Sequence, residues 1–134
     1  MKKRLDAAFP AEQWIERAEN DLRNAQYTLT LKENCPFDTV CFHAQQSVEK
    51  YLKALLLKFS VDFPKTHDLR VLLQIAEKKA SLKFDKKRVL LLNRYVIEGR
   101  YPGDWDPITR SEAEEAVQTA KATITQIRDI FEKI

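Results

Sequence analysis

Apolar residues recur at spacings of three and four along most of the chain, which is typical of helices that bury one face. The pattern predicts five helices, over about residues 11–32, 38–60, 66–79, 86–98 and 111–134. Residues 89–92 are apolar almost all round, so we expect the fourth helix to lie centrally. Long helices with short connections favour an all-α, up-and-down helical bundle of four to five helices.

Residues that commonly cap helices predict where the later helices begin. Thr66 is expected to cap the third helix, with Asp68 in its first turn. Asp85 is expected to cap the fourth helix. Ser111 and Glu114 have the spacing of a capping box, which places the start of the fifth helix.

Composition narrows the class of protein. The chain has only two glycines, Gly99 and Gly103, too few for the turns of a β-rich fold, and Gly99 is the predicted end of the fourth helix. Its 134 residues suit one domain over 1–134. A net charge of +3 permits binding of phosphate or nucleic acid without requiring it. We expect no membrane span and a cytoplasmic location, because no stretch of the sequence is apolar for long enough to cross a membrane. We also expect no cofactor and no metal site, since Cys35 and Cys41 lack the spacing of metal ligands.

The predicted second helix has a polar face that carries candidate phosphate ligands. His43, Lys50 and Lys53 lie on this face, within an arc of roughly 80° that also holds Gln46. Histidine titrates near neutral pH, and lysines bind phosphate as point charges. The alternative interpretation is a solvated helix face.

Two further groups of residues are candidates for binding an anion. His67 and Asp68 open the third helix, where backbone N–H groups either receive an anion or are satisfied by capping. Arg94, Arg100 and Tyr101 surround the end of the fourth helix and offer guanidinium forks and a stacking ring. The alternative for this second group is structural, with the rings packed on the end of the bundle and the arginines bound to carboxylates.

Three segments match known sequence motifs in order along the chain. They are residues 44–54, AQQSVEKYLKA, residues 66–69, THDL, and residues 100–102, RYP, followed by Asp104. In this order they resemble the second-helix signature, the next motif and the third motif of HEPN domains (higher eukaryotes and prokaryotes nucleotide-binding domain). The last motif is similar to that of the Arg-Tyr-Pro branch of the family, which includes a domain for which nucleotide binding is proposed. Residues 14–22 also fit the family's first helix.

The resemblance implies a helical bundle that is often dimeric. It also implies a minimal nucleotidyltransferase as partner in a toxin–antitoxin-like pair. Many family members are metal-independent ribonucleases with an Arg, a gap of four to six residues, and a His. Neither His43 nor His67 has an Arg at that spacing. We therefore expect little ribonuclease activity and favour a homodimer that binds a nucleotide or other phosphate ligand, or RNA.

The predicted ligand site is a polar cleft between the second and fourth helices. One wall holds His43, Lys50 and Lys53, and the other holds Arg94 and Arg100. Two alternative functions stay open. One is an RNA endonuclease that uses a histidine as acid or base, and the other is a structural, antitoxin-like interaction protein.

Overall fold

The computed structural model describes residues 9–96 and 107–134, in which all regular structure is helical. This confirms the all-α bundle. The elements are α2 (Ala11–Leu29), α3 (Phe37–Lys58), α4 (Leu69–Glu77), α5 (Lys86–Leu91), the 3₁₀ helix η1 (Leu92–Tyr95) and α6 (Arg110–Glu132).

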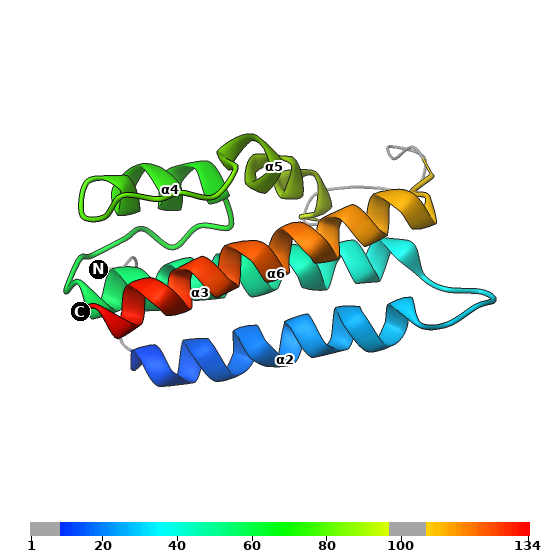
Figure 1. Cartoon of the computed structure of the whole chain (residues 1–134), viewed down its shortest axis with the longest axis horizontal. Helices are drawn as coiled ribbons and strands as arrows, with labels where there is room; N and C mark the ends of the chain where they lie inside the picture. Colours follow the sequence, from blue (N-terminus) through cyan, green and yellow to red (C-terminus); the bar gives the residue numbers. More distant parts are fainter. Residues whose placement is uncertain (1–8, 97–106) are drawn as a thin grey trace.

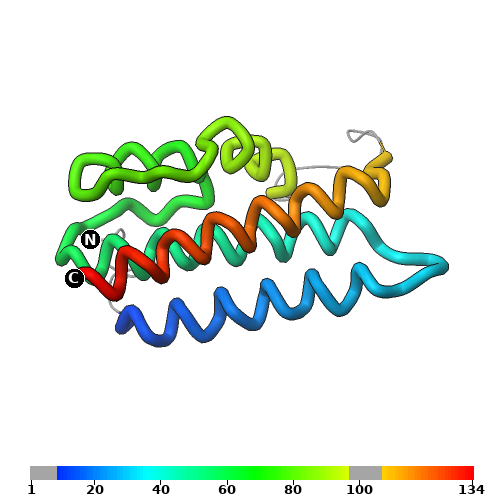
Figure 2. The backbone as a smooth tube through the Cα atoms, in the orientation of Figure 1, coloured from blue at the N-terminus to red at the C-terminus, as the bar shows by residue number. Residues whose placement is uncertain are grey.

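Three long helices form the body of the molecule, and the shorter helices lie along one side of it (Figure 1). α3 returns antiparallel to α2, and α6 runs in the same direction as α3, because α4 and α5 bring the chain back to the end where α3 begins (Figure 2). Arg110, the first residue of α6, fixes this end by donating hydrogen bonds to the carbonyl oxygens of Leu29 and Leu31.

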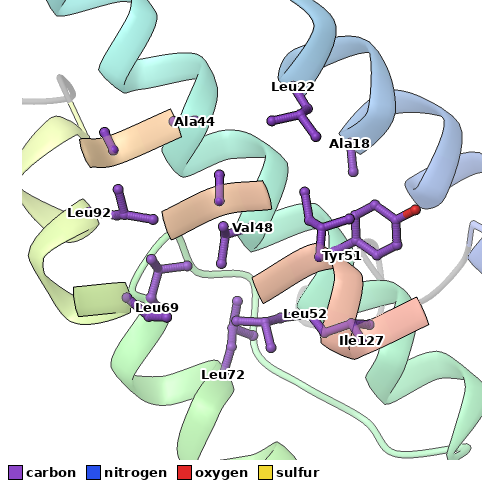
Figure 3. Packing of buried hydrophobic residues seen from close by; sticks show 14 of the residues in the cluster. Ala18, Leu22, Ala44, Val48, Tyr51, Leu52, Leu69, Leu72, Leu92 and Ile127 are labelled. Carbon is purple, nitrogen blue, oxygen red and sulfur yellow. The ribbon is translucent and has the colours of Figure 1, made fainter. Parts of the chain in front are cut away.

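α3 is the central helix, and the core forms on both sides of it. Its apolar residues face α2 and α6 on one side and α4 and η1 on the other (Figure 3). The apolar stripes of α2 and α6 are buried against it, with Ala18 and Leu22 on α2 and Ala120, Ile124 and Ile127 on α6. Neither α3 nor any other helix among the described residues is long and apolar enough to cross a membrane.

Two helix starts differ from the prediction by a few residues. α4 begins at Leu69 with Asp68 as its N-cap, and the Asp68 carboxylate accepts from the Arg70 N–H. The Thr66 hydroxyl instead accepts a hydrogen bond from the Asp68 N–H, in the loop just before the helix begins. α6 is capped by Thr109, not Ser111. The Thr109-x-x-Glu spacing fits a capping box as well as the Ser111-x-x-Glu spacing does, so the sequence leaves both starts open.

The prediction of one central helix over residues 86–98 was wrong. Asp85 caps α5 as expected, but the α-helix ends at Leu91 and continues as the 3₁₀ turn of η1. Val89 and Leu92 are buried, whereas Leu91 is 57% exposed. The apolar run therefore covers the edge of the bundle with one face only. The predicted stop at Gly99 lies outside the described residues.

Candidate functional site: a polar pocket above a buried carboxylate

The middle of α3 carries a buried ion pair. The side chains of Glu49 and Lys53, one turn apart, are each 3% exposed, and Lys53 Nζ lies 3.2 Å from Glu49 Oε2. The Lys53 ammonium also lies 5.2 Å from the centroid of the Trp14 ring and 6.0 Å from that of Phe63. Lys53 is thus inside the bundle, where burial of a charge is costly unless it is paired.

His67 binds the same carboxylate from the loop before α4. Its Nδ1 lies 3.1 Å from both Oε1 and Oε2 of Glu49. Gln45 donates to Glu49 Oε1 at 3.2 Å and to the His67 carbonyl oxygen at 3.3 Å, and it accepts from Gln46 at 2.7 Å. The His67 side chain is 50% exposed. One edge of the ring is therefore fixed by a buried network while the ring itself reaches the surface.

An open pocket of about 320 Å³, which we call the His67 pocket, lies beside the ring of His67. It is lined by His67, Asp68, Arg70, Asn93 and Val96. Its volume is at the lower end of the range for small-molecule sites, roughly 300–1,000 Å³. Within the described residues, no group of His, Cys, Asp or Glu side chains is arranged to hold a metal ion.

Asn93 of η1 joins the pocket to the start of α4. Its Oδ1 accepts from the Leu69 N–H at 2.9 Å, and its Nδ2 donates to Asp68 Oδ1 at 3.0 Å. Asp68 already accepts from the Arg70 N–H, so the first amides of α4 are satisfied by side chains. The capping interpretation therefore describes this helix start, and an anion in the pocket would have to bind side chains.

His43 and Lys50 share a different carboxylate. Asp21 on α2 accepts from Lys50 Nζ at 2.6 Å through Oδ2, and its Oδ1 lies 2.9 Å from His43 Nδ1. All three side chains are largely buried between α2 and α3. This part of the predicted polar face is a helix–helix contact, and Lys53 belongs to the Glu49 network instead.

The other predicted wall is described only in part. Arg94 Nη1 lies 3.8 Å from Glu112 Oε2, and the Tyr95 hydroxyl donates to the same carboxylate. Burial is the larger cause and this hydrogen bond the next, and together they raise the pKa of Tyr95 far above its ordinary value. Arg100 and Tyr101 lie outside the described residues, so their convergence with His43 stays a prediction.

A further polar cluster joins the three long helices. The Tyr51 hydroxyl on α3 and the Arg128 guanidinium on α6 both donate to Glu19 on α2. Burial raises the pKa of Glu19, but the hydrogen bonds from Arg128 and Tyr51 outweigh it, and the net pKa is lowered. Burial and the bond to Glu19 raise the pKa of Tyr51 to about 12. This cluster ties the bundle together away from the pocket.

Sequence reasoning identified Lys53 as a candidate but did not predict that it pairs with Glu49 beneath the His67 pocket. Glu49 and Lys53 have the spacing of a helical ion pair, and they interrupt an otherwise apolar stretch. That signal could have indicated an internal pair. No local signal connects Asn93 with Asp68 or Asp21 with His43, because these pairs are 25 and 22 residues apart.

Comparison with known proteins places the chain in a family. A model of the HEPN domain matches residues 11–130. A Methanocaldococcus jannaschii protein named "Putative toxin MJ1304" is 31% identical, covering 92% of this chain and 89% of that protein.

Two solved structures share the fold. TT1696 from Thermus thermophilus superposes with a TM-score of 0.72 at 30% identity, covering 89% of this chain and 96% of that one. ST0689, described as an archaeal HEPN homologue, has a TM-score of 0.70 at 21% identity, covering 90% and 97%. The family match runs from the start of α2 to residue 130 in α6, and the chain belongs to the HEPN family.

Proposed function

We propose that this HEPN chain binds the phosphate group of a nucleotide or of an RNA strand in the His67 pocket. The observation that carries the proposal is the His67 ring, which is fixed on buried Glu49 and reaches the surface beside Arg70. Two segments that resemble HEPN motifs meet here, since Gln45 and Glu49 come from one and His67 from the other.

Arg70 is the second phosphate ligand in this proposal. Its side chain is 67% exposed, and its Nη2 lies 3.6 Å from Asp68 Oδ2, a weak contact that leaves the guanidinium able to turn. Guanidinium groups bind phosphate through two parallel hydrogen bonds. The nearby Asp68 carboxylate accepts hydrogen bonds from the backbone N–H of Arg70 and the side-chain amide of Asn93, which partly offset its repulsion of an anion.

Calorimetric titration with adenosine monophosphate and with a short single-stranded RNA tests this function. Arg70→Ala should weaken binding by about 1.5–3 kcal/mol, the usual range for a charged hydrogen bond, with little change in Tm. Arg88→Ala is the matched control, because Arg88 is exposed on α5 and does not line the His67 pocket. Equal losses in both variants, or no binding by the unaltered chain, would contradict the proposal.

Assembly is part of the same proposal. The chain works as a homodimer and alongside a nucleotidyltransferase in a toxin–antitoxin-like pair. The relative named "Putative toxin MJ1304" supports the toxin part of this role. Large side chains at the surface, among them Tyr27 and Leu91, offer apolar area for contacts. Light scattering should give twice the chain mass of 15.7 kDa, and a monomer at tens of micromolar would contradict the homodimer.

A second candidate function is RNA cleavage. A histidine held by a carboxylate is suited to transfer a proton to or from a reacting hydroxyl, and His67 with Glu49 has this arrangement. Because the Arg-gap-His spacing is absent, we expect little cleavage of single-stranded RNA in EDTA. Robust cleavage that His67→Gln abolishes and His43→Gln retains would favour the nuclease over the binding protein.

A further inference from the structure

We propose that Glu49 is a positioning residue that holds His67 with its proton on Nδ1, and that Lys53 keeps Glu49 ionised for this purpose. The assignment makes Nε2 the nitrogen of His67 that exchanges a proton or accepts a hydrogen bond at the pocket. The purpose of this arrangement rests on the proposed function, whereas the tautomer of His67 is a property of the chain without ligand.

The geometry at Nδ1 determines the tautomer. An ionised carboxylate only accepts hydrogen bonds, so the ring nitrogen that faces it must carry the proton. Nδ1 lies 3.1 Å from both Glu49 oxygens, which is the geometry of one N–H shared between two acceptors. The neutral ring therefore bears its hydrogen on Nδ1 and a lone pair on Nε2.

The ionised state of Glu49 follows from its donors. A carboxyl group buried alone favours its neutral form, whereas a nearby cation and hydrogen-bond donors favour the charged form. Lys53 Nζ lies 3.2 Å from Oε2, and the Gln45 and Gln46 amides donate to Oε1 at 3.2 and 3.4 Å. These three donors come from the same helix as Glu49, so the arrangement is independent of a ligand.

The ring is also fixed through its backbone. Gln45 bonds both to Glu49 and to the carbonyl oxygen of His67, which links the carboxylate to the main chain that carries the ring. In the part of the chain that the structure describes, the titratable groups next to His67 include Glu49 from α3, which Lys53 also contacts, and Asp68 and Arg70, which line the same pocket. Asn93 of η1 adds a neutral side chain to the pocket wall.

Long-range proton–nitrogen NMR of the histidine rings tests the assignment on the full chain. The chain has two histidines, so a His43→Gln background leaves only the His67 signals. At a pH where the ring is neutral, we expect Nδ1–H to be the dominant tautomer. Replacing Glu49 and Lys53 together by Met removes the acceptor without leaving a lone buried charge. In that variant the ring should change to the Nε2–H tautomer that imidazoles in water prefer.

Each outcome bears on one proposal only. A ring protonated on Nε2 in the unaltered chain would overturn the positioning role, even where adenosine monophosphate binds normally. A ring that keeps its proton on Nδ1 in the double variant would also overturn the positioning role. A ring protonated on Nδ1 in a chain that binds no phosphate ligand would support the positioning role and contradict the proposed function. The measurement on the unaltered chain decides the assignment should the double variant not fold.

Discussion

Glu49 and His67 are 18 residues apart in the chain, yet Nδ1 of the imidazole lies 3.1 Å from both oxygens of the carboxylate. The contact joins the central helix to the loop that precedes α4. A buried charge network is expensive to build, and apolar residues of similar volume often serve stability as well or better. Its presence directly beneath a surface pocket is therefore more simply explained by function than by folding.

Breaking the buried pair should destabilise the fold strongly. Glu49→Gln removes the carboxylate that lies 3.2 Å from the buried Lys53 ammonium, and we expect a loss of about 3–5 kcal/mol in the free energy of unfolding by urea. Replacing both residues by Met should cost less than either single change. Lys58→Met, at a more exposed pair with Glu12, should change stability by no more than about 0.5 kcal/mol. A double variant that loses the sum of the single losses would show that the charges are not coupled.

Asn93 should be important because its amide satisfies two partners at once. Asn93→Ala removes the acceptor for the Leu69 N–H and the donor to Asp68, and we expect a loss of about 1–3 kcal/mol in the free energy of unfolding. Asn24→Ala, which removes only an exposed acceptor for Thr28, is the control and should have little effect. Equal stability of the two variants would indicate that η1 and α4 are held together by apolar packing alone.

The Glu19 cluster should make stability fall in acid. The pKa of Glu19 is lowered in the folded state, so its contribution is fully present above the ordinary value of 4.5 and is lost as pH falls through the lowered pKa. Glu19→Gln should therefore flatten the decline of unfolding free energy with decreasing pH below about 4.5. Glu16→Gln, one turn from Glu19 in sequence on an exposed side of α2, is the control. An unchanged acid slope in Glu19→Gln would contradict the assignment.

At high pH the buried Cys41 and Tyr51 should destabilise the fold. Burial raises the pKa of the Cys41 thiol from 9.0 to about 12, and the pKa of Tyr51 is also about 12. Raised folded-state values mean that the stabilisation is present below about pH 9 and is lost as pH rises toward 12. Cys41→Ala should reduce the alkaline slope of unfolding free energy, whereas Cys35→Ala should retain it. A reduced alkaline slope in Cys35→Ala but not in Cys41→Ala would contradict the assignment to Cys41.

The sequence was a good guide to the helices and a poorer one to their ends. Periodicity identifies the buried stripe of α2, because a 3.6-residue repeat is a local property. Residues 89–92 misled the prediction, since an apolar run reads the same whether the helix is central or lies on an edge. The start of α6 was ambiguous because Thr109 and Ser111 each have a Glu three residues later.

The site depended on contacts that a single sequence does not contain. His67 and Asp68 were identified as candidates, and the structure places both at one pocket. Lys53 was expected beside His43 and Lys50, but helical spacing cannot tell which carboxylate a lysine will meet. Asp21 from α2 binds His43 and Lys50, while Glu49 binds Lys53. Only the packing of α2 against α3 separates the two groups.

Chemical-shift mapping with adenosine monophosphate is the most direct test of phosphate binding at the His67 pocket. The side-chain signals of His67, Arg70 and Asn93 should move first and saturate together, because these groups line the pocket. His43, held by Asp21 between α2 and α3, should move little and serves as the internal reference. Shifts centred on His43 and Lys50, or no shifts at millimolar ligand, would contradict binding at the His67 pocket.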